Sequence, residues 1–364
     1  MRWFAPIDTR EDGIMVQDDL TRLDRQAPTR VILEQAGGWG RWGTRLAWLI
    51  TGVSLLAAIG SAGAFSQYFQ RDPRVVETYH SLSKAAPAKV AIVTISGAIM
   101  GGEGFARAQL DTVEADESVR AIVLRIDSPG GTVSGSDELH HRIAGLASRR
   151  DLPVVVSMGG IAASGGYYVA MANGGREDVI YAEPATLTGS IGVIIPSFDL
   201  SQLLKRIDVR DDSVASGPLK EMLSPTKDRT PELAEREREV LESLVADMFT
   251  RFKEIVRAGR PKLDAQAVDA VATGQVFTSR QALEAGLVDR IGFVEDAVAR
   301  AVELAGLTTD TARVVRYSRP RGLLDDVLGG AIPGAREPLE LLAEMTAPRG
   351  WYLCSWWPAL ITSR

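Results

Sequence analysis

The sequence predicts an α/β protein with parallel strands in its central region and one membrane-spanning helix near its N-terminus. From residue 88 onward, short apolar runs alternate with helical patterns, which is typical of parallel α/β architecture. Two of these runs end in glycine-rich turns that pass directly into a helix. Residues Leu46 to Phe65 form an uncharged stretch of twenty residues, which is long enough to cross a bilayer.

The N-terminal part divides into a tail, residues 1–45, an anchor, residues 46–68, and a linker, residues 69–87. The tail carries seven basic and seven acidic residues with little periodicity, which predicts poor order. The apolar core begins too far from the first residue for an ordinary cleaved signal peptide, so an uncleaved anchor is favoured. Basic residues flank both ends of the anchor equally, so the charges do not predict its orientation.

Residues 88–320 read as one domain of alternating strands and helices, and residues 321–364 as a C-terminal tail. Within the domain, Thr230 and Pro231 predict the start of a long helix that ends near Arg257, with threonine as the cap. Another helix is expected over Ser134–Arg149. The expected strands are Val90–Ile95, Ala121–Ile126, Val154–Met158, Val179–Ala182 and Ile191–Ile195.

Ser164 is the candidate nucleophile. It lies in Gly159–Tyr168, where an apolar strand is expected to turn into a helix and the neighbouring residues are small. Small neighbours let a substrate backbone approach, and the amide that follows the serine can face developing negative charge. A glycine-rich turn with an incidental serine would give the same local pattern.

A second glycine turn follows the strand Ala121–Ile126, at Gly130 and Gly131. Strand ends gather on one edge of a parallel sheet, so the amides of Gly130 or Gly131 are expected to meet the amide of Gly165. Two such amides would form an oxyanion hole. Without the nucleophile, this turn would be an ordinary strand-to-helix connection.

The base that would activate the serine is harder to find. All three histidines, His80, His140 and His141, precede Ser164, which excludes the order serine, acid, histidine of the α/β-hydrolases. Lys220, between Gly-Pro and Ser-Pro turn signals, remains as a candidate base or as a surface lysine, and Ser190 offers a hydroxyl that could hold its amine or simply close a turn. A lysine base must be neutral, which requires burial in an apolar pocket.

Together these motifs resemble the signal peptide peptidase A family of bacteria, the Ser/Lys-dyad serine peptidases of family S49. The resemblance covers roughly residues 88 to 318. It rests on Asp127–Gly131, Ala162–Tyr168, Thr188–Val193, Ser216–Lys220, Gly274–Thr278 and Gln281–Asp289.

The resemblance implies a spiral ββα-repeat fold of the caseinolytic protease and crotonase type. It implies that Ser164 is the nucleophile, Lys220 the general base and Ser190 the residue that orients the lysine, with amides of Gly131 and Gly165 as oxyanion donors. It also implies a homo-oligomer, in which serine and lysine can come from different protomers. The expected substrates are hydrophobic peptides such as signal peptide remnants. The expected location is the bacterial inner membrane, with a cytoplasmic N-terminus and an extracytoplasmic protease.

Composition limits the other classes. The chain has 364 residues, 45% of them hydrophobic, and a formal net charge of −6 without a basic stripe, so no nucleic-acid partner is expected. No metal-ligand spacing occurs and no cofactor is expected. The single cysteine excludes an intramolecular disulfide framework.

The seven tryptophans all lie outside residues 49–350, and three of them, Trp351, Trp356 and Trp357, stand in the C-terminal tail. Large apolar side chains are unfavourable in water, so we expect this end to dock on the membrane interface, on the protease assembly or in the peptide groove. A disordered tail is the alternative. For the whole chain, the alternative functions are an acyl-CoA enzyme on the crotonase-like fold and a catalytically idle membrane scaffold.

Overall fold

The computed structural model describes residues 43, 45–55, 58, 75–101 and 104–319, together with the backbone of residues 351–353. The chain forms two compact units, Met1–Phe69 and Gln70–Arg364. In the first unit, residues 45–55 are helical and exposed. Among the described residues, no helix combines the length and the apolar character needed to cross a membrane. Most of the expected anchor beyond residue 55 lies outside the described residues, as do residues 1–42 and 44 of the expected tail 1–45 and most of residues 320–364.

A nine-stranded sheet forms the centre of the second unit, in the order β1-β10-β2-β3-β5-β6-β9. All neighbours along this path pair in parallel except β1 and β10. The end of β5 also pairs in parallel with β7, which pairs antiparallel with β8. The strands are β1 (Val76–Leu82), β2 (Ala88–Ser96), β3 (Val119–Ser128), β5 (Val154–Ala163), β6 (Ile180–Ala182), β7 (Leu187–Gly189), β8 (Val276–Thr278), β9 (Arg290–Ile291) and β10 (Ala312–Ser318).

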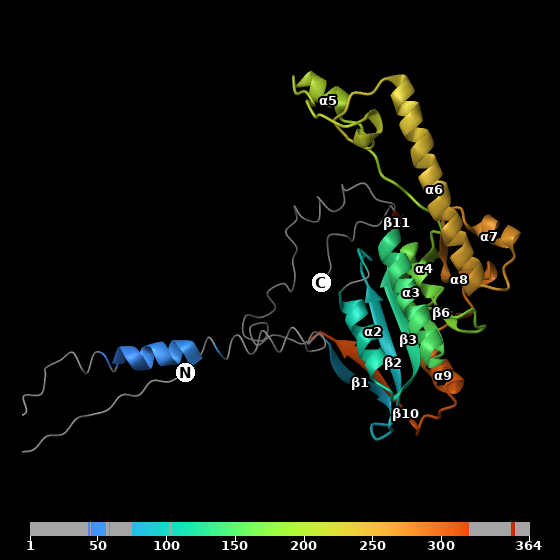
Figure 1. The fold of residues 1–364 in the computed structure, drawn as a ribbon. Coiled ribbons are helices and arrows are strands. Elements are labelled where there is room, and N and C mark those ends of the chain that lie inside the picture. Colours follow the sequence, from blue (N-terminus) through green and yellow to red (C-terminus); the bar gives the residue numbers. More distant parts are fainter. Residues whose placement is uncertain are drawn as a thin grey trace, which may run out of the picture. The chain divides into compact units, whose positions relative to one another are not determined.

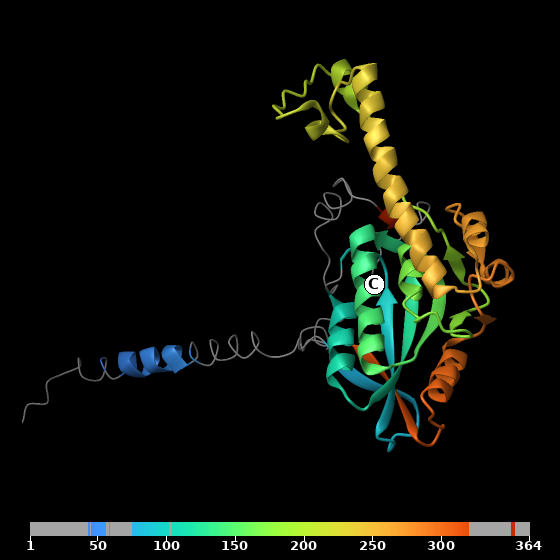
Figure 2. The ribbon, with the colours of Figure 1, turned by 45° about the vertical axis from the view of Figure 1, so that its right-hand side comes forward.

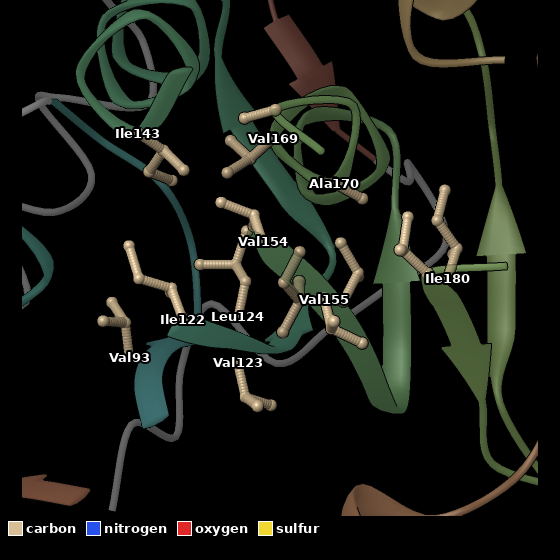
Figure 3. Packing of buried hydrophobic residues seen from close by; sticks show 14 of the residues in the cluster. Val93, Ile122, Val123, Leu124, Ile143, Val154, Val155, Val169, Ala170 and Ile180 are labelled. Carbon is tan, nitrogen blue, oxygen red and sulfur yellow. The ribbon is translucent and has the colours of Figure 1, made fainter. Parts of the chain in front are cut away.

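The central strands are buried on both faces, which explains why they are continuous apolar runs in the sequence. Ile122 and Leu124 of β3 are directed toward Ile143 and Val169, and Val123 points the opposite way (Figure 3). All five side chains are fully buried. A parallel sheet needs helices on both faces, and this one has them.

Helices therefore cover both faces of the sheet. Figure 1 shows α2 and α3 lying across the strands, and α9 packs against β3 and β5. The helices are α2 (Phe105–Ala115), α3 (Val133–Arg150), α4 (Gly165–Ala170), α5 (Ser201–Arg206), α6 (Pro231–Gly259), α7 (Ala265–Val271), α8 (Ser279–Glu284) and α9 (Val294–Leu304), with a 3₁₀ turn η1 (Pro218–Glu221). The predicted α/β class is confirmed.

Two local expectations were wrong. Residues 76–82, which the sequence places in the linker, form β1 because they pair with β10 at the edge of the sheet. Ile191–Ile195 is not a strand; the strand in this region is β7, which ends at Gly189. Gly189 and Ser190 have φ of 79° and 52°, and two successive residues with positive φ stop an extended strand. The long helix predicted from Pro231 is present as α6, with the side chain of Thr230 accepting a bond from the amide of Leu233.

One segment projects from the body of the second unit. We call residues 193–230 the arm; it contains α5 and η1 and lies at the N-terminal end of α6 (Figures 1 and 2). Arg229 of the arm pairs with the nearly buried Glu237 of α6 at 2.6 Å and donates to the carbonyl of Ser224. These contacts fix the arm to the N-terminal end of α6.

Candidate active site

Ser164 stands between the end of β5 and the start of α4, in a strained backbone conformation. Its φ of 54° and ψ of −116° lie outside the regions that ordinary residues occupy. The amide of Ser164 donates to the carbonyl of Gly189 at 2.8 Å, and its own carbonyl accepts from the amide of Tyr168 at 2.9 Å. These bonds hold the backbone at the turn, so they fix the direction in which the side chain leaves it.

The hydroxyl of Ser164 is buried and unpaired. The residue is 1% exposed, and its Oγ has no hydrogen-bond partner among the described residues. An unpaired buried polar group destabilises a protein by about 1–3 kcal/mol. A serine that only stabilised this turn would bond its hydroxyl to a neighbour, so the arrangement is one that function explains better than stability.

Gly165, the first residue of α4, lies against β4 (Gly130–Thr132). A Cβ atom on Gly165 would stand 2.4 Å from Oγ of Ser136, 3.0 Å from the amide nitrogen of Gly131 and 3.2 Å from Cα of Gly130. The structure therefore brings together the three glycines that the sequence singled out, Gly130, Gly131 and Gly165. Only a residue without a side chain fits at position 165.

The amide of Gly131 faces the same side as the start of α4. In its bridge with Ile99, the carbonyl of Gly130 accepts from Ile99 at 2.8 Å and the amide of Thr132 donates to Ile99 at 2.8 Å. Since successive residues of a strand direct their backbone groups to opposite sides, the N–H of Gly131 faces away from Ile99. It is thus directed to the side of β4 on which Gly165 lies.

Ser190 follows the end of β7, the strand that pairs with the end of β5. In the parallel pairing of β5 with β7, Ala163 is opposite Gly189, so Ser164 and Ser190 follow directly after paired residues. Ser190 is 6% exposed, and its amide donates to the carbonyl of Gln275 at 2.7 Å. Gln275, the residue directly before β8, therefore holds the backbone of Ser190.

Sequence reasoning missed the role of the segment Gly274–Thr278. The segment contributes only to the family resemblance and is not among the expected strands, whereas Val276–Thr278 forms β8 and carries the ring of Phe277 to within 2.5 Å of a Cβ built on Gly189. The β-branched and aromatic residues of the segment are the signal that could have found the strand. Ser136, whose Oγ lies against the position of a Cβ on Gly165, was also missed, because the sequence predicts only that it lies in a helix.

The histidines of α3 do not reach the serine. The ring of His140 packs edge-on against Tyr168, with ring centroids 5.5 Å apart, and burial lowers the pKa of His140 below its usual value. Tyr168 in turn bonds Asp137 and packs against Phe252 of α6. His140 therefore belongs to the packing behind α4, and His141 is exposed on the helix surface.

The structure does not bring Lys220 to Ser164 within one chain. Lys220 lies in η1 on the arm and is exposed. Glu221, the next residue along the chain, pairs with Lys227 at 2.5 Å. Between Glu237, which holds the arm, and Phe252, which contacts α4, the helix α6 rises by about 22 Å. Figure 1 likewise shows the arm at the far end of α6 from α4.

The arm exposes many large apolar side chains. Phe198 is 73% exposed and Val214 is fully exposed. Others of this kind are Ile194, Leu200, Leu203, Ile207 and Val209. So many exposed apolar side chains on one segment are typical of an interaction surface. Elsewhere, the described residues hold no group of three or more His, Cys, Asp or Glu that could bind a metal ion.

Comparison with known proteins identifies relatives over most of the second unit. The sequence model described as "Peptidase family S49" matches residues 147–308. The chain is 40% identical over 243 residues to "Putative protease slr0021" of Synechocystis sp., covering 66% of this chain and 83% of that protein. It is 36% identical over 242 residues to "Protease 4" of Salmonella typhi, covering 63% of this chain and 37% of that protein.

Two further comparisons extend the picture. The chain is 33% identical over 247 residues to "Serine protease SPPA, chloroplastic" of Arabidopsis thaliana, covering 66% of this chain and 35% of that protein. Among solved structures, a ClpP1 variant of Listeria monocytogenes matches 57% of this chain and 94% of that chain, with 17% identity and a TM-score of 0.38. A likeness at that score carries no argument about this chain.

Proposed function

Because this chain belongs to peptidase family S49 and is a serine protease, we propose that Ser164 is its nucleophile and that it cleaves extended hydrophobic peptides. The observation that carries this proposal is the buried, unpaired Oγ of Ser164 on a backbone with φ of 54°. A hydroxyl held this way is positioned for attack before the substrate arrives, which lowers the entropic part of the barrier.

The amides of Gly131 and Gly165 complete the reacting centre. As Oγ of Ser164 gives its proton to the base and adds to the peptide carbonyl, the carbonyl oxygen becomes negative and accepts from these two N–H groups. Collapse of this intermediate releases the amine, which takes a proton from the base, and leaves an ester on Ser164. Water, activated by the same base, then hydrolyses the ester and frees the serine.

Lys220 is the proposed base, and it is supplied by a second copy of the chain. Among the described residues, Ser164 and Ser190 follow the paired ends of β5 and β7, while the arm carries Lys220 away from that sheet. Docking of the exposed apolar arm on a neighbouring copy would cover Phe198 and Val214 and bring the amine of Lys220 beside Ser190. The hydroxyl of Ser190 would then accept or donate a bond that fixes the neutral amine.

Mixing two inactive variants tests this arrangement. Ser164→Ala and Lys220→Ala should each abolish peptide hydrolysis. Assembled together from equal amounts, the two should recover about a quarter of wild-type activity, because a random neighbour pair supplies both residues at one site in four. The control is the double variant Ser164→Ala/Lys220→Ala, which should show no activity. No recovery in the mixture would show that serine and lysine act within one chain or that Lys220 is not the base.

A fluorophosphonate probe tests the nucleophile separately. It should label the wild-type chain and leave Ser164→Ala unlabelled, while an acyl-CoA enzyme of related fold or an idle scaffold would not react at Ser164 in either form. The matched control is Ser136→Ala, which removes a nearby buried hydroxyl that already donates to the carbonyl of Thr132 at 2.9 Å and should keep its labelling.

The remaining proposal concerns location. The anchor expected over residues 46–68 would tether the protease to the inner membrane with the second unit on the extracytoplasmic face, where signal peptide remnants are released into the bilayer. Removal of residues 1–68 should move the protein from the membrane to the soluble fraction without loss of hydrolysis of a soluble hydrophobic peptide. Membrane association that persists unchanged would contradict the anchor.

A further inference from the structure

The C-terminal segment lies on the strand that carries the proposed oxyanion amide. Residues Trp351–Leu353 form β11, which pairs antiparallel with β4. Tyr352 is opposite Gly131, Leu353 is opposite Gly130, and Trp351 is opposite Thr132. The short strand also contacts α3 and α4, the helix that begins directly after Ser164. In Figure 1 it lies beside the ends of α3 and α4.

The pairing uses the backbone groups that catalysis would need. The N–H of Gly131 faces away from Ile99, as the bonds of Gly130 and Thr132 to Ile99 require. The N–H of Gly131 therefore faces the side of β4 on which β11 lies, where Tyr352 is the paired residue. In an antiparallel pair, a residue whose N–H and C=O face the partner occupies the hydrogen-bonding position. The backbone of Tyr352 therefore takes the place of a substrate carbonyl at Gly131.

We propose that β11 is a built-in competitor that occupies the substrate strand of its own protease until a peptide displaces it. Peptides bind exposed sheet edges by adding a strand, and β11 does this at the edge of β4. The inference rests on the proposed function for its effect on activity, but the docking itself does not depend on catalysis.

Deletion of residues 349–364 should raise kcat/KM for a hydrophobic peptide by about three- to tenfold, since only chains with an open site bind substrate. A synthetic peptide of residues 349–364 added to the truncated protein should raise KM and leave kcat unchanged, and a scrambled peptide should do neither. Tyr352→Pro in the full chain should reproduce the deletion, because proline removes the N–H that faces β4. Thr362→Pro is the matched control and should behave as the wild type.

A second readout separates docking from catalysis. In the inactive Ser164→Ala background, hydrogen exchange of the fragment that contains Gly131 should accelerate on deletion of residues 349–364 or in Tyr352→Pro. Faster exchange together with no hydrolysis by any form would support the docking and refute the proposed function. Unchanged exchange and unchanged kcat/KM in both variants would overturn the docking proposal.

Discussion

Gly165→Ala is the substitution that most directly tests the proposed oxyanion site, because the structure leaves no room for the added methyl group. That carbon would stand 2.4 Å from Oγ of Ser136 and 3.0 Å from the amide nitrogen of Gly131. The first contact can be relieved by moving a side chain, whereas the second requires β4 and α4 to separate. The substitution thus widens the gap between the two amides that the proposal assigns to the oxyanion.

Two magnitudes follow from this geometry. Overpacking of a buried site costs about 1–3 kcal/mol, which for a domain of this size lowers Tm by about 2–10 °C. Misplacing one oxyanion donor lowers kcat by about 10²- to 10³-fold. Calorimetry measures the first, and hydrolysis of a fluorogenic hydrophobic peptide measures the second. Active-site titration with a fluorophosphonate separates a slow enzyme from a partly folded one.

Two companion variants make the result decisive. Gly145→Ala lies within α3, where the added carbon meets only the end of the flexible Arg149 side chain, so it should keep activity and gain up to about 1 kcal/mol. The double variant Ser136→Ala/Gly165→Ala removes the contact at 2.4 Å and should recover part of the stability, while kcat stays low because the contact with Gly131 remains. Gly165→Ala with wild-type kcat would refute the assignment of these amides.

Three further changes have outcomes that the structure fixes. Ser190→Ala should lower kcat about tenfold or more and leave Tm unchanged, because the amide rather than the hydroxyl of Ser190 bonds Gln275; equal loss of Tm would make its role structural. Burial holds the pKa of His140 in the folded protein below its value in the unfolded chain, so the free energy of unfolding should decline as pH falls below about 6.5. His140→Gln should remove this decline, which is at most about 1.4 kcal/mol per pH unit. Chemical denaturation at several pH values measures it, and an unchanged slope in the variant would exclude the effect. Arg229→Met leaves the buried carboxylate of Glu237 unpaired and should expose the arm to proteolysis, whereas Arg229→Met/Glu237→Leu should protect it again; equal cleavage of both would contradict the role of the pair.

Much of the fold could be predicted because the strands of the centre are buried on both faces and are therefore continuous apolar runs. Residues 121–126 and 154–158 fall within β3 and β5, and the long helix begins at Pro231 as its cap predicts. The edges could not be predicted this way. The strand β1 owes its conformation to pairing with β10, which lies more than two hundred residues away in the chain, and no local pattern reveals such a partner.

The candidate site shows the same division. The family predicted from the glycine-rich motifs was confirmed by the comparisons. Ser164 and the glycines could be placed near one another because parallel strand ends share an edge, whereas the role of Ser190 came only from the resemblance. Lys220 could not, since spacing along the chain does not say whether a lysine points toward its own sheet or another. The roles of these residues stay predictions until the variants above are measured. The spiral repeat of the fold also stays a prediction.

The positive φ of Ser164 also limits which residue types can replace serine at this position during evolution. A threonine at this position would place a branched Cβ in a conformation that β-branched residues almost never adopt, so a change from serine to threonine strains the backbone at the proposed nucleophile. Cysteine, which is unbranched, meets no such barrier. Proteins with cysteine at position 164 can therefore arise by a single substitution without that strain, whereas proteins with threonine there cannot.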